Sequence, residues 1–210
     1  SYMSNKKLIF ITHLFPNNQE ENKGIFMQKR LDAILPHISK YSIVVSPIPY
    51  CPKFIGKVSK RWSKYINVNV EGSHRGVNVH YPRFFRPPGK WFRVIEGTSM
   101  YISILYLILK KRLNIKNFDY ILAGNINDDG IAALLLGRTF KIPATSYAIG
   151  HDLNIYPFQS KSMLILTKLV LKKLNKVFFV GNGFYDKSIK IFGNSSNKLV
   201  NILGVELDSF

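Results

Sequence analysis

Three consecutive segments decide the fold of this chain: Leu8-Ile-Phe-Ile-Thr12, Gly24-Ile-Phe-Met-Gln-Lys-Arg-Leu-Asp-Ala-Ile-Leu-Pro36 and Tyr41-Ser-Ile-Val-Val-Ser46. The first segment is an unbroken apolar run, which is typical of a strand buried on both faces of a sheet. The second has apolar residues at helical spacing, and the third is again a short apolar run. A strand, a helix and a strand in this order predict two parallel strands joined by a crossover helix.

The same alternation continues to the end of the chain. Strand patterns recur over 77–81, 119–123, 143–148, 176–180 and 198–203, and helical patterns over 96–113, 131–136, 160–174 and 182–192. The sequence therefore predicts one Rossmann-like, doubly wound α/β domain with about six or seven mostly parallel strands.

Two local features refine this prediction. We expect Asp128 or Asp129 to cap the helix over 131–136, and we expect that helix to end at Gly137. The last strand pattern is followed by a short acidic turn and no helix. We therefore expect residues 1–203 to form the domain and residues 204–210 to begin a linker to a second domain that this chain lacks.

The composition describes a globular and strongly basic protein. Hydrophobic residues make up 46% of the chain, which excludes disorder, and the formal net charge is +18. Fourteen basic residues but only three acidic ones lie within 51–120. Such a field favours phospholipid, nucleotide, nucleic acid or polyanionic glycan, although solvated faces of a basic protein would give the same composition.

Cysteine and histidine usage limits the chemistry. Cys51 is the only cysteine, so no internal disulfide can form and a cytoplasmic location is expected. The five histidines show no paired i, i+4 spacing, and no Gly-x-Ser-x-Gly motif occurs, so we expect neither a metal site nor hydrolase chemistry. The longest apolar run, Tyr101–Leu109, is far short of the roughly 20 residues that span a bilayer, which predicts a soluble or peripheral protein.

In a parallel sheet, ligands bind beyond the carboxyl ends of the strands. No Gly-x-Gly-x-x-Gly or P-loop motif follows any predicted strand, which disfavours dinucleotide and P-loop chemistry. Lys23-Gly24 at a predicted helix start would let backbone N–H groups approach a phosphate, or it is a plain helix-start glycine. Gly181-Asn182-Gly183 resembles a phosphate loop only weakly, and an ordinary strand-to-helix turn explains it as well.

Two neighbouring strand exits carry further polar groups. His151 and Asp152, in the sequence Gly150-His-Asp, could bind sugar hydroxyls or transfer a proton, although His-Asp pairs are also common in turns. At the preceding strand exit the candidate hydrogen-bonding residues are Asn125, Asn127 and Asp128, which could equally serve only to cap the following helix.

The segment Pro82-Arg-Phe-Phe-Arg-Pro-Pro-Gly-Lys-Trp-Phe-Arg93 combines basic and aromatic residues. Such a segment could stack on nucleic acid, or it could lie on anionic lipid with its aromatic rings inserted. We favour a membrane surface or a lipid-linked acceptor over nucleic acid. The residues expected to face lipid are Arg83, Phe84, Phe85, Arg86, Lys90, Trp91 and Arg93.

The order of the soft motifs resembles a known family. Lys23-Gly-Ile-Phe-Met-Gln28, Tyr81-Pro-Arg-Phe-Phe-Arg-Pro-Pro-Gly89, Ile142-Pro143, Gly150-His-Asp-Leu-Asn154 and Leu203-Gly-Val-Glu-Leu-Asp-Ser-Phe210 follow one another along the whole chain. In this order they resemble the N-terminal domain of the family-four, retaining GT-B glycosyltransferases. The likeness is greatest to bacterial enzymes of teichuronic acid and capsule synthesis in the cell envelope.

The resemblance implies the acceptor-binding half of an enzyme that transfers a sugar from a nucleotide-sugar donor, without a cofactor or a metal. The donor would bind mainly through the missing C-terminal domain, the acceptor would be a saccharide or lipid-linked saccharide, and the isolated chain would be inactive. The enzyme would be cytoplasmic, at the inner face of the plasma membrane. The residues implied are His151 and Asp152 as catalytic groups, Lys23 and Gly24 at the donor phosphate, and Asn125, Asn127, Asp128 and Gly150 at the acceptor.

The chain departs from the family pattern at two positions. Many members have two glycines in the first loop, where only Gly24 matches, and many carry His or Arg where this chain has Ile149. Two other classes of function stay open. One is a stand-alone basic module that binds membranes or polyanions, and the other is a nucleotide-dependent Rossmann-type enzyme.

Overall fold

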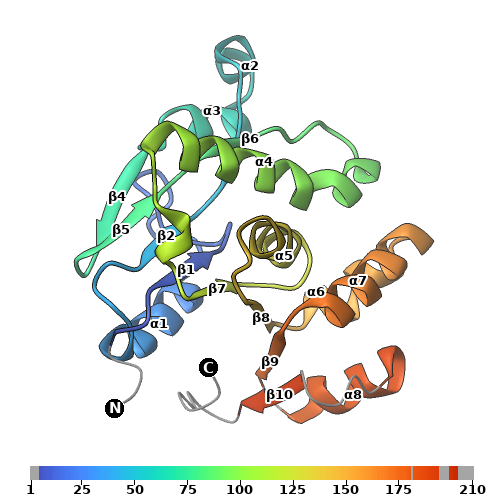
Figure 1. Cartoon of the computed structure of the whole chain (residues 1–210). Coiled ribbons are helices and arrows are strands. Elements are labelled where there is room, and N and C mark those ends of the chain that lie inside the picture. The colour runs from blue at the N-terminus through green and yellow to red at the C-terminus, as the bar shows by residue number, and fades with distance from the viewer. Residues whose placement is uncertain (1–4, 181, 194–198, 203–210) are drawn as a thin grey trace.

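A computed structural model of the protein describes residues 5–180, 182–193 and 199–202. Its centre is an eight-stranded sheet in the order β10-β9-β8-β7-β1-β2-β5-β4 (Figure 1). Two further strands, β3 and β6, pair separately. The strands are β1 Leu8–Ile11, β2 Ile43–Val45, β3 Ile48–Pro49, β4 Glu71–His74, β5 Val77–His80, β6 Arg83–Phe84, β7 Tyr120–Ala123, β8 Ala144–Ala148, β9 Lys176–Val180 and β10 Leu199–Ile202.

All pairings in the main sheet are parallel except that of β4 with β5. The predicted Rossmann-like α/β class and the prediction of up to seven parallel strands are therefore confirmed. Strand β4 was not predicted, because Glu-Gly-Ser-His has no apolar alternation. It lies at the edge of the sheet, where burial does not require such a pattern.

Helices cover both faces of the sheet. They are α1 Ile25–Ile34, α2 Lys53–Val58, α3 Lys60–Ile66, α4 Arg93–Lys111, α5 Asp128–Phe140, α6 His151–Asn154, α7 Lys161–Lys173 and α8 Asn182–Phe192. Adjacent residues of β1 serve opposite faces: Phe10 packs in a cluster with Met27 of α1, and Ile11 in a cluster with Leu136 of α5. This explains the unbroken apolar run, since both faces of β1 are buried. Helix α4 lies across α5, on its far side from the sheet (Figure 1).

Helix α5 differs from its prediction at both ends. It begins at Asp128 and continues through Gly137 to Phe140, where Lys141 in the left-handed conformation ends it. Neither Asp128 nor Asp129 caps it; Asn127 is the N-cap residue and its side chain makes no capping bond. The carboxylate of Asp129 is instead bonded to His13. The predicted linker at 204–210 lies outside the described residues.

Candidate functional site

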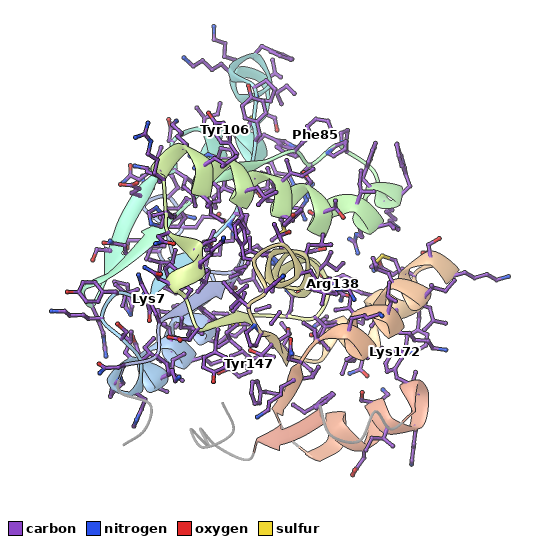
Figure 2. The ribbon with its side chains drawn as sticks, in the orientation of Figure 1. Lys7, Phe85, Tyr106, Arg138, Tyr147 and Lys172 are labelled. Carbon is purple, nitrogen blue, oxygen red and sulfur yellow. The ribbon has the colours of Figure 1, made fainter. Side chains whose placement is uncertain are left out.

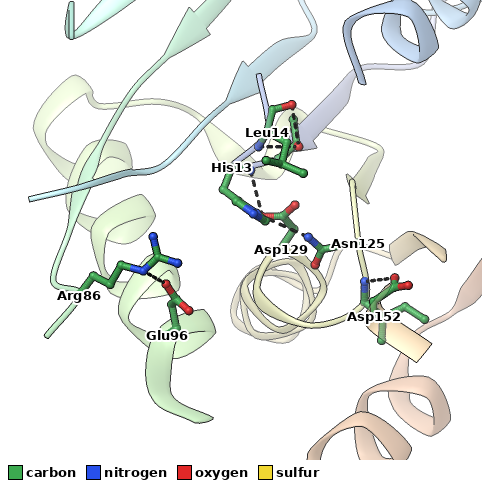
Figure 3. A network of polar contacts seen from close by, with 9 residues as sticks. His13, Leu14, Arg86, Glu96, Asn125, Asp129 and Asp152 are labelled. Carbon is green, nitrogen blue, oxygen red and sulfur yellow. Dashed lines mark hydrogen bonds and ion pairs between the residues drawn. The ribbon is translucent and has the colours of Figure 1, made fainter. Parts of the chain in front are cut away.

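The carboxyl ends of β1, β7 and β8 lie side by side, and the loops that follow them are joined by hydrogen bonds. His13 follows β1, Asp129 lies in the first turn of the helix after β7, and Asp152 follows β8 (Figure 3). Asp129 accepts bonds from the first loop, and Asp152 accepts one from Ile126 in the second. Loops from three neighbouring strands therefore form one polar site at this edge of the sheet.

His13 and Asp129 form the centre of this site. The carboxylate oxygen Oδ1 of Asp129 lies 2.8 Å from Nδ1 of His13 and accepts the His13 backbone N–H at 3.0 Å. The Asp129 side chain is fully buried, whereas 27% of the His13 side chain is exposed. A buried carboxylate thus fixes the Nδ1 edge of a partly exposed imidazole ring. This arrangement suits proton exchange with a ligand.

The backbone around His13 is held by close packing. Thr12 Oγ1 accepts the N–H of Leu14 at 3.1 Å, which turns the chain directly after β1. Gly124 allows the β7 exit to approach, since an added Cβ atom would lie 2.7 Å from Thr12 Oγ1. Gly24 adopts φ +65°, and a Cβ there would lie 2.1 Å from the Leu14 carbonyl oxygen. The structure thus gives Gly24 a packing role at the base of the His13 loop.

Charged side chains surround the His13–Asp129 pair. Arg86 forms an ion pair with Glu96, which is buried on α4 beside the start of α5 (Figure 3). Lys23 lies 3.8 Å from Glu20, and its pKa is lowered by burial and by its cationic neighbours Lys64 and Arg86. A lysine in such surroundings is suited to meeting an anion, because the added negative charge would stabilise its ammonium group.

Two acid–base groups in the site have shifted pKa values. Burial lowers the pKa of His13, but the Asp129 carboxylate outweighs this effect, and the pKa lies above its usual 6.5. Burial and the charge of Glu96 raise the pKa of Asp128 to about 7, although His13 partly opposes them. Asp128 therefore titrates near neutral pH, and His13 keeps its proton to a higher pH than a free imidazole does. Such shifts are common in groups that exchange protons with substrates.

The pKa of Asp128 predicts a pH-dependent stability. The folded chain holds this proton up to about pH 7, whereas the unfolded chain loses it near 3.8, so Asp128 removes stability as pH rises between these values. We expect Asp128→Asn to raise the melting temperature by about 5 °C at pH 8, with little gain at pH 4. Thermal denaturation followed by circular dichroism measures both values. The matched control is Asp186→Asn, at an exposed carboxylate on α8, and an equal gain at both pH values would contradict the assignment.

The structure gives the predicted catalytic residues different surroundings. Asp152 is 1% exposed, and its carboxylate accepts backbone N–H groups of Ile126, Ile149 and Gly150 at 2.8 to 3.2 Å. Burial raises the pKa of Asp152, and these hydrogen bonds oppose the rise. The carboxylate joins the β7 and β8 loops, which is a positioning role. His151, at the start of α6, is exposed.

The predicted acceptor residues also have different surroundings. Asn125 lies in the site, with its Nδ2 3.5 Å from His13 Nδ1, and its Oδ1 is buried without a partner among the described residues. Asn127 is buried and bonds Asp152 O and Thr167 Oγ1, so it ties α5 to α6 and α7. Asn125 and Asp128 thus lie beside His13, whereas Asn127 is a packing residue.

Two of the residues expected to face lipid do not. Phe84 is 3% exposed and packs in the core, because strand β6 pairs with β3 and turns this ring inward. Arg83 is partly buried, and its guanidinium donates to the carbonyl oxygens of Tyr81 and Val68. The prediction is corrected at both positions. Among the remaining positions, Phe85, Arg86, Lys90 and Trp91 are exposed, and Arg93 is partly exposed, with its guanidinium 2.7 Å from Gln159 Oε1.

A pocket of about 490 Å³ opens between α3 and the segment that leads into α4. Its lining includes Arg61, Trp62, Phe85, Arg86, Lys90 and Glu96. The Arg86–Glu96 pair also influences the pKa of Asp128, so this pocket adjoins the His13 site. The combination of aromatic walls and cationic groups suits a ligand that carries both a ring and a negative charge.

The main residues of the site, His13 and Asp129, were not singled out from the sequence. In the sequence, His13 carried no signal beyond its place directly after a buried strand. Asp129 was read only as a helix cap. Within the described residues, no group of three His, Cys, Asp or Glu side chains is placed to hold a metal ion.

Comparisons with known proteins place the fold. No family model matches the chain. A Bacillus subtilis (strain 168) protein, provisionally named as the teichuronic acid biosynthesis glycosyltransferase TuaC, is 23% identical over 206 residues. That alignment covers 97% of this chain and 51% of the relative. The chain therefore spans about half the length of this curated relative.

Solved structures give a consistent result. Arabidopsis thaliana UGT89C1 complexed with quercetin superposes with a TM-score of 0.51 at 10% identity, covering 94% of this chain and 50% of that one. The same protein complexed with UDP-L-rhamnose gives a TM-score of 0.47 at 12% identity, covering 90% and 45%. At these identities the first superposition shows the fold alone, which is that of one half of a GT-B protein.

Proposed function

We propose that this chain, a partial GT-B glycosyltransferase domain, is the acceptor-binding half of a retaining, nucleotide-sugar-dependent enzyme. Its product would be a bacterial cell-surface polysaccharide, made on the cytoplasmic side of the membrane. The acceptor would be a saccharide or a lipid-linked saccharide. The donor would bind mainly through a second domain, since the relative of similar sequence is about twice as long.

The observation that carries this proposal is the partly exposed His13 held by buried Asp129 at the carboxyl edge of the sheet. Because Asp129 engages Nδ1, the other ring nitrogen, Nε2, is the one left for a ligand. It can accept a hydrogen bond from a sugar hydroxyl or take its proton, and the Asp129 carboxylate stabilises the imidazolium that results. Asn125 and Asp128 beside the ring add groups that can bind hydroxyls.

The anionic part of a nucleotide sugar also has a suitable partner. Lys23 lies at the base of the same loop, where its charge lowers the pKa of His13 and the Asp129 carboxylate raises the pKa of Lys23. Burial is the main cause of its lowered pKa, and the nearby carboxylate of Glu20 only partly offsets it. A donor phosphate placed there would stabilise the ammonium group, which supports the role assigned to Lys23.

The His13–Asp129 pair also favours a second candidate, transfer with inversion. A carboxylate-backed imidazole is the general base that direct displacement by an acceptor hydroxyl requires: the hydroxyl proton moves to His13, its oxygen forms the new glycosidic bond, and the nucleoside diphosphate leaves. The anomeric configuration of the new glycosidic bond, read by NMR from the purified product and compared with that of the donor, distinguishes the two. Retention supports the proposal, and inversion selects the second candidate.

The proposed roles of the acceptor-binding and donor-binding halves of the enzyme can be tested directly. We expect residues 1–210 alone to transfer no sugar and to show no nucleotide-induced thermal stabilisation, while the full-length protein releases nucleoside diphosphate from its donor in the presence of acceptor. A panel of nucleotide sugars and cell-envelope saccharides identifies the substrates. Transfer or tight nucleotide binding by the isolated chain would contradict the proposal.

A further inference from the structure

Helix α4 presents an apolar stripe to the outside. Ile95, Ile102, Tyr106 and Leu109 are 48% to 76% exposed. Their spacing of seven, four and three residues places them on one face of the helix. Glu96, the acidic residue of α4, turns inward to Arg86, so the stripe carries no charge until Lys110.

The opposite face of the same helix is also apolar. Met100, Ile104 and Leu107 are buried against the core above α5. The segment Lys90–Lys111 accordingly has the length and mean hydropathy, 1.4, of a membrane-spanning helix, with 39% of its apolar window buried. A surface helix that packs only against the protein core needs one apolar face. The outer apolar stripe of α4 therefore indicates contact with a second apolar surface outside this domain.

Further exposed apolar side chains belong to elements on the same side of the molecule (Figure 1). Phe54 and Val58 of α2 are 71% and 85% exposed, and Phe85 and Trp91 before α4 are 66% and 72% exposed. Helix α2 projects from the side of the molecule where α4 lies (Figure 1), and Tyr106 and Phe85 lie on that side (Figure 2). We call these exposed apolar residues the α4 face: Phe54, Val58, Phe85, Trp91, Ile95, Ile102, Tyr106 and Leu109.

The charges beside the α4 face are of one sign. The exposed cationic residues on α2, on α3, before α4 and at the end of α4 are Lys53, Lys57, Lys60, Arg61, Arg86, Lys90, Lys110, Lys111 and Arg112. From residue 51 to 112 the acidic residues are Glu71, paired with Lys111, and Glu96, paired with Arg86. The positive charge beside these apolar side chains is therefore largely uncompensated.

We propose that the α4 face docks on the surface of an anionic lipid bilayer. Aromatic and aliphatic side chains would enter the interface while lysines meet lipid phosphates, the pattern of an interfacial rather than a spanning helix. Uniform positive charge favours this occupant over a second copy of the chain, because two such faces repel each other. This inference stands apart from the proposed activity, since it uses neither His13 nor Asp129.

Vesicle flotation of the purified chain tests the proposal. We expect binding to phosphatidylcholine vesicles that contain phosphatidylglycerol, loss of binding as salt rises, and no binding to phosphatidylcholine alone. Ile102→Gln combined with Leu109→Gln should weaken binding about tenfold, since both side chains would leave the interface. Lys57→Gln should weaken it about fivefold. Trp91 emission should shift to the blue on binding, and Trp91→Phe should remove that shift.

Matched controls lie on α7. Ile165, which is 66% exposed, and Lys168 have the same chemistry on a different surface, so Ile165→Gln and Lys168→Gln should leave binding unchanged. Circular dichroism verifies the fold of each variant. Binding indifferent to lipid charge, equal losses in the α7 variants, or a dimer that dissociates in the Ile102 and Leu109 variant would each overturn the proposal. So would a full-length protein whose vesicle binding ignores these substitutions.

Discussion

Replacement of His13 by alanine is expected to lower the turnover of the full-length protein by about 10²- to 10⁴-fold, the usual contribution of one acid–base group. The expected loss is in kcat more than in KM, because the ring acts on the transferring proton. The fold should persist, since the His13 backbone N–H still donates to Asp129. Release of nucleoside diphosphate under saturating donor measures the effect.

The pH profile separates this role from a structural one. The Asp129 carboxylate holds the pKa of His13 above 6.5, so activity that needs the neutral ring should rise through an inflection above that value. In Asp129→Asn the inflection should move to lower pH, because the carboxylate that raises it is gone. A merely structural Asp129 would change the rate without moving the inflection.

A second His–Asp pair supplies the control. His74 Nε2 lies 2.6 Å from Asp32 Oδ1, on β4 and α1 and outside the site. Substituting His74 by alanine should leave turnover nearly unchanged. Activity of His13→Ala within about threefold of the wild type would remove His13 from the mechanism and, with it, the main support for the proposed site.

Asp152→Ala is expected to reduce the free energy of unfolding by about 3–5 kcal/mol, because three backbone N–H groups would lose their shared acceptor inside the protein. For a chain of this length that corresponds to a melting temperature lower by about 10 °C. Thermal and urea denaturation of the purified chain measure the loss.

Two further variants show whether Asp152 affects activity only by stabilising the fold. Asp152→Asn keeps an acceptor oxygen and should lose less than half as much stability, and exposed His151→Ala should lose almost none. If Asp152→Asn is as stable as the wild type but the full-length variant is inactive, the carboxylate is catalytic after all. A stability loss in Asp152→Ala below about 1 kcal/mol would contradict the positioning role.

Local patterns predicted most of the strands and helices, and the reason is visible in particular residues. The run Leu8–Ile11 is apolar because α1 and α5 bury opposite faces of β1. The sequence of this strand therefore indicates that helices cover both faces of the sheet. Where burial is incomplete, the hydrophobic pattern of the sequence does not predict the structure. Strand β4 is exposed at the edge, and Phe84 and Phe85 have identical chemistry, but only the pairing of β6 with β3 decides which ring is buried.

The sequence by itself determined the class of sheet, its parallel direction and the edge at which polar loops gather, because these follow from burial and chain direction within short segments. Only the tertiary structure decided that His13 meets Asp129 across 116 positions. That contact requires β1 to lie beside β7 in the centre of the sheet, with Gly124 small enough to let their loops approach. The order of strands is set by how all the crossover helices pack together, and no single segment of the chain encodes it.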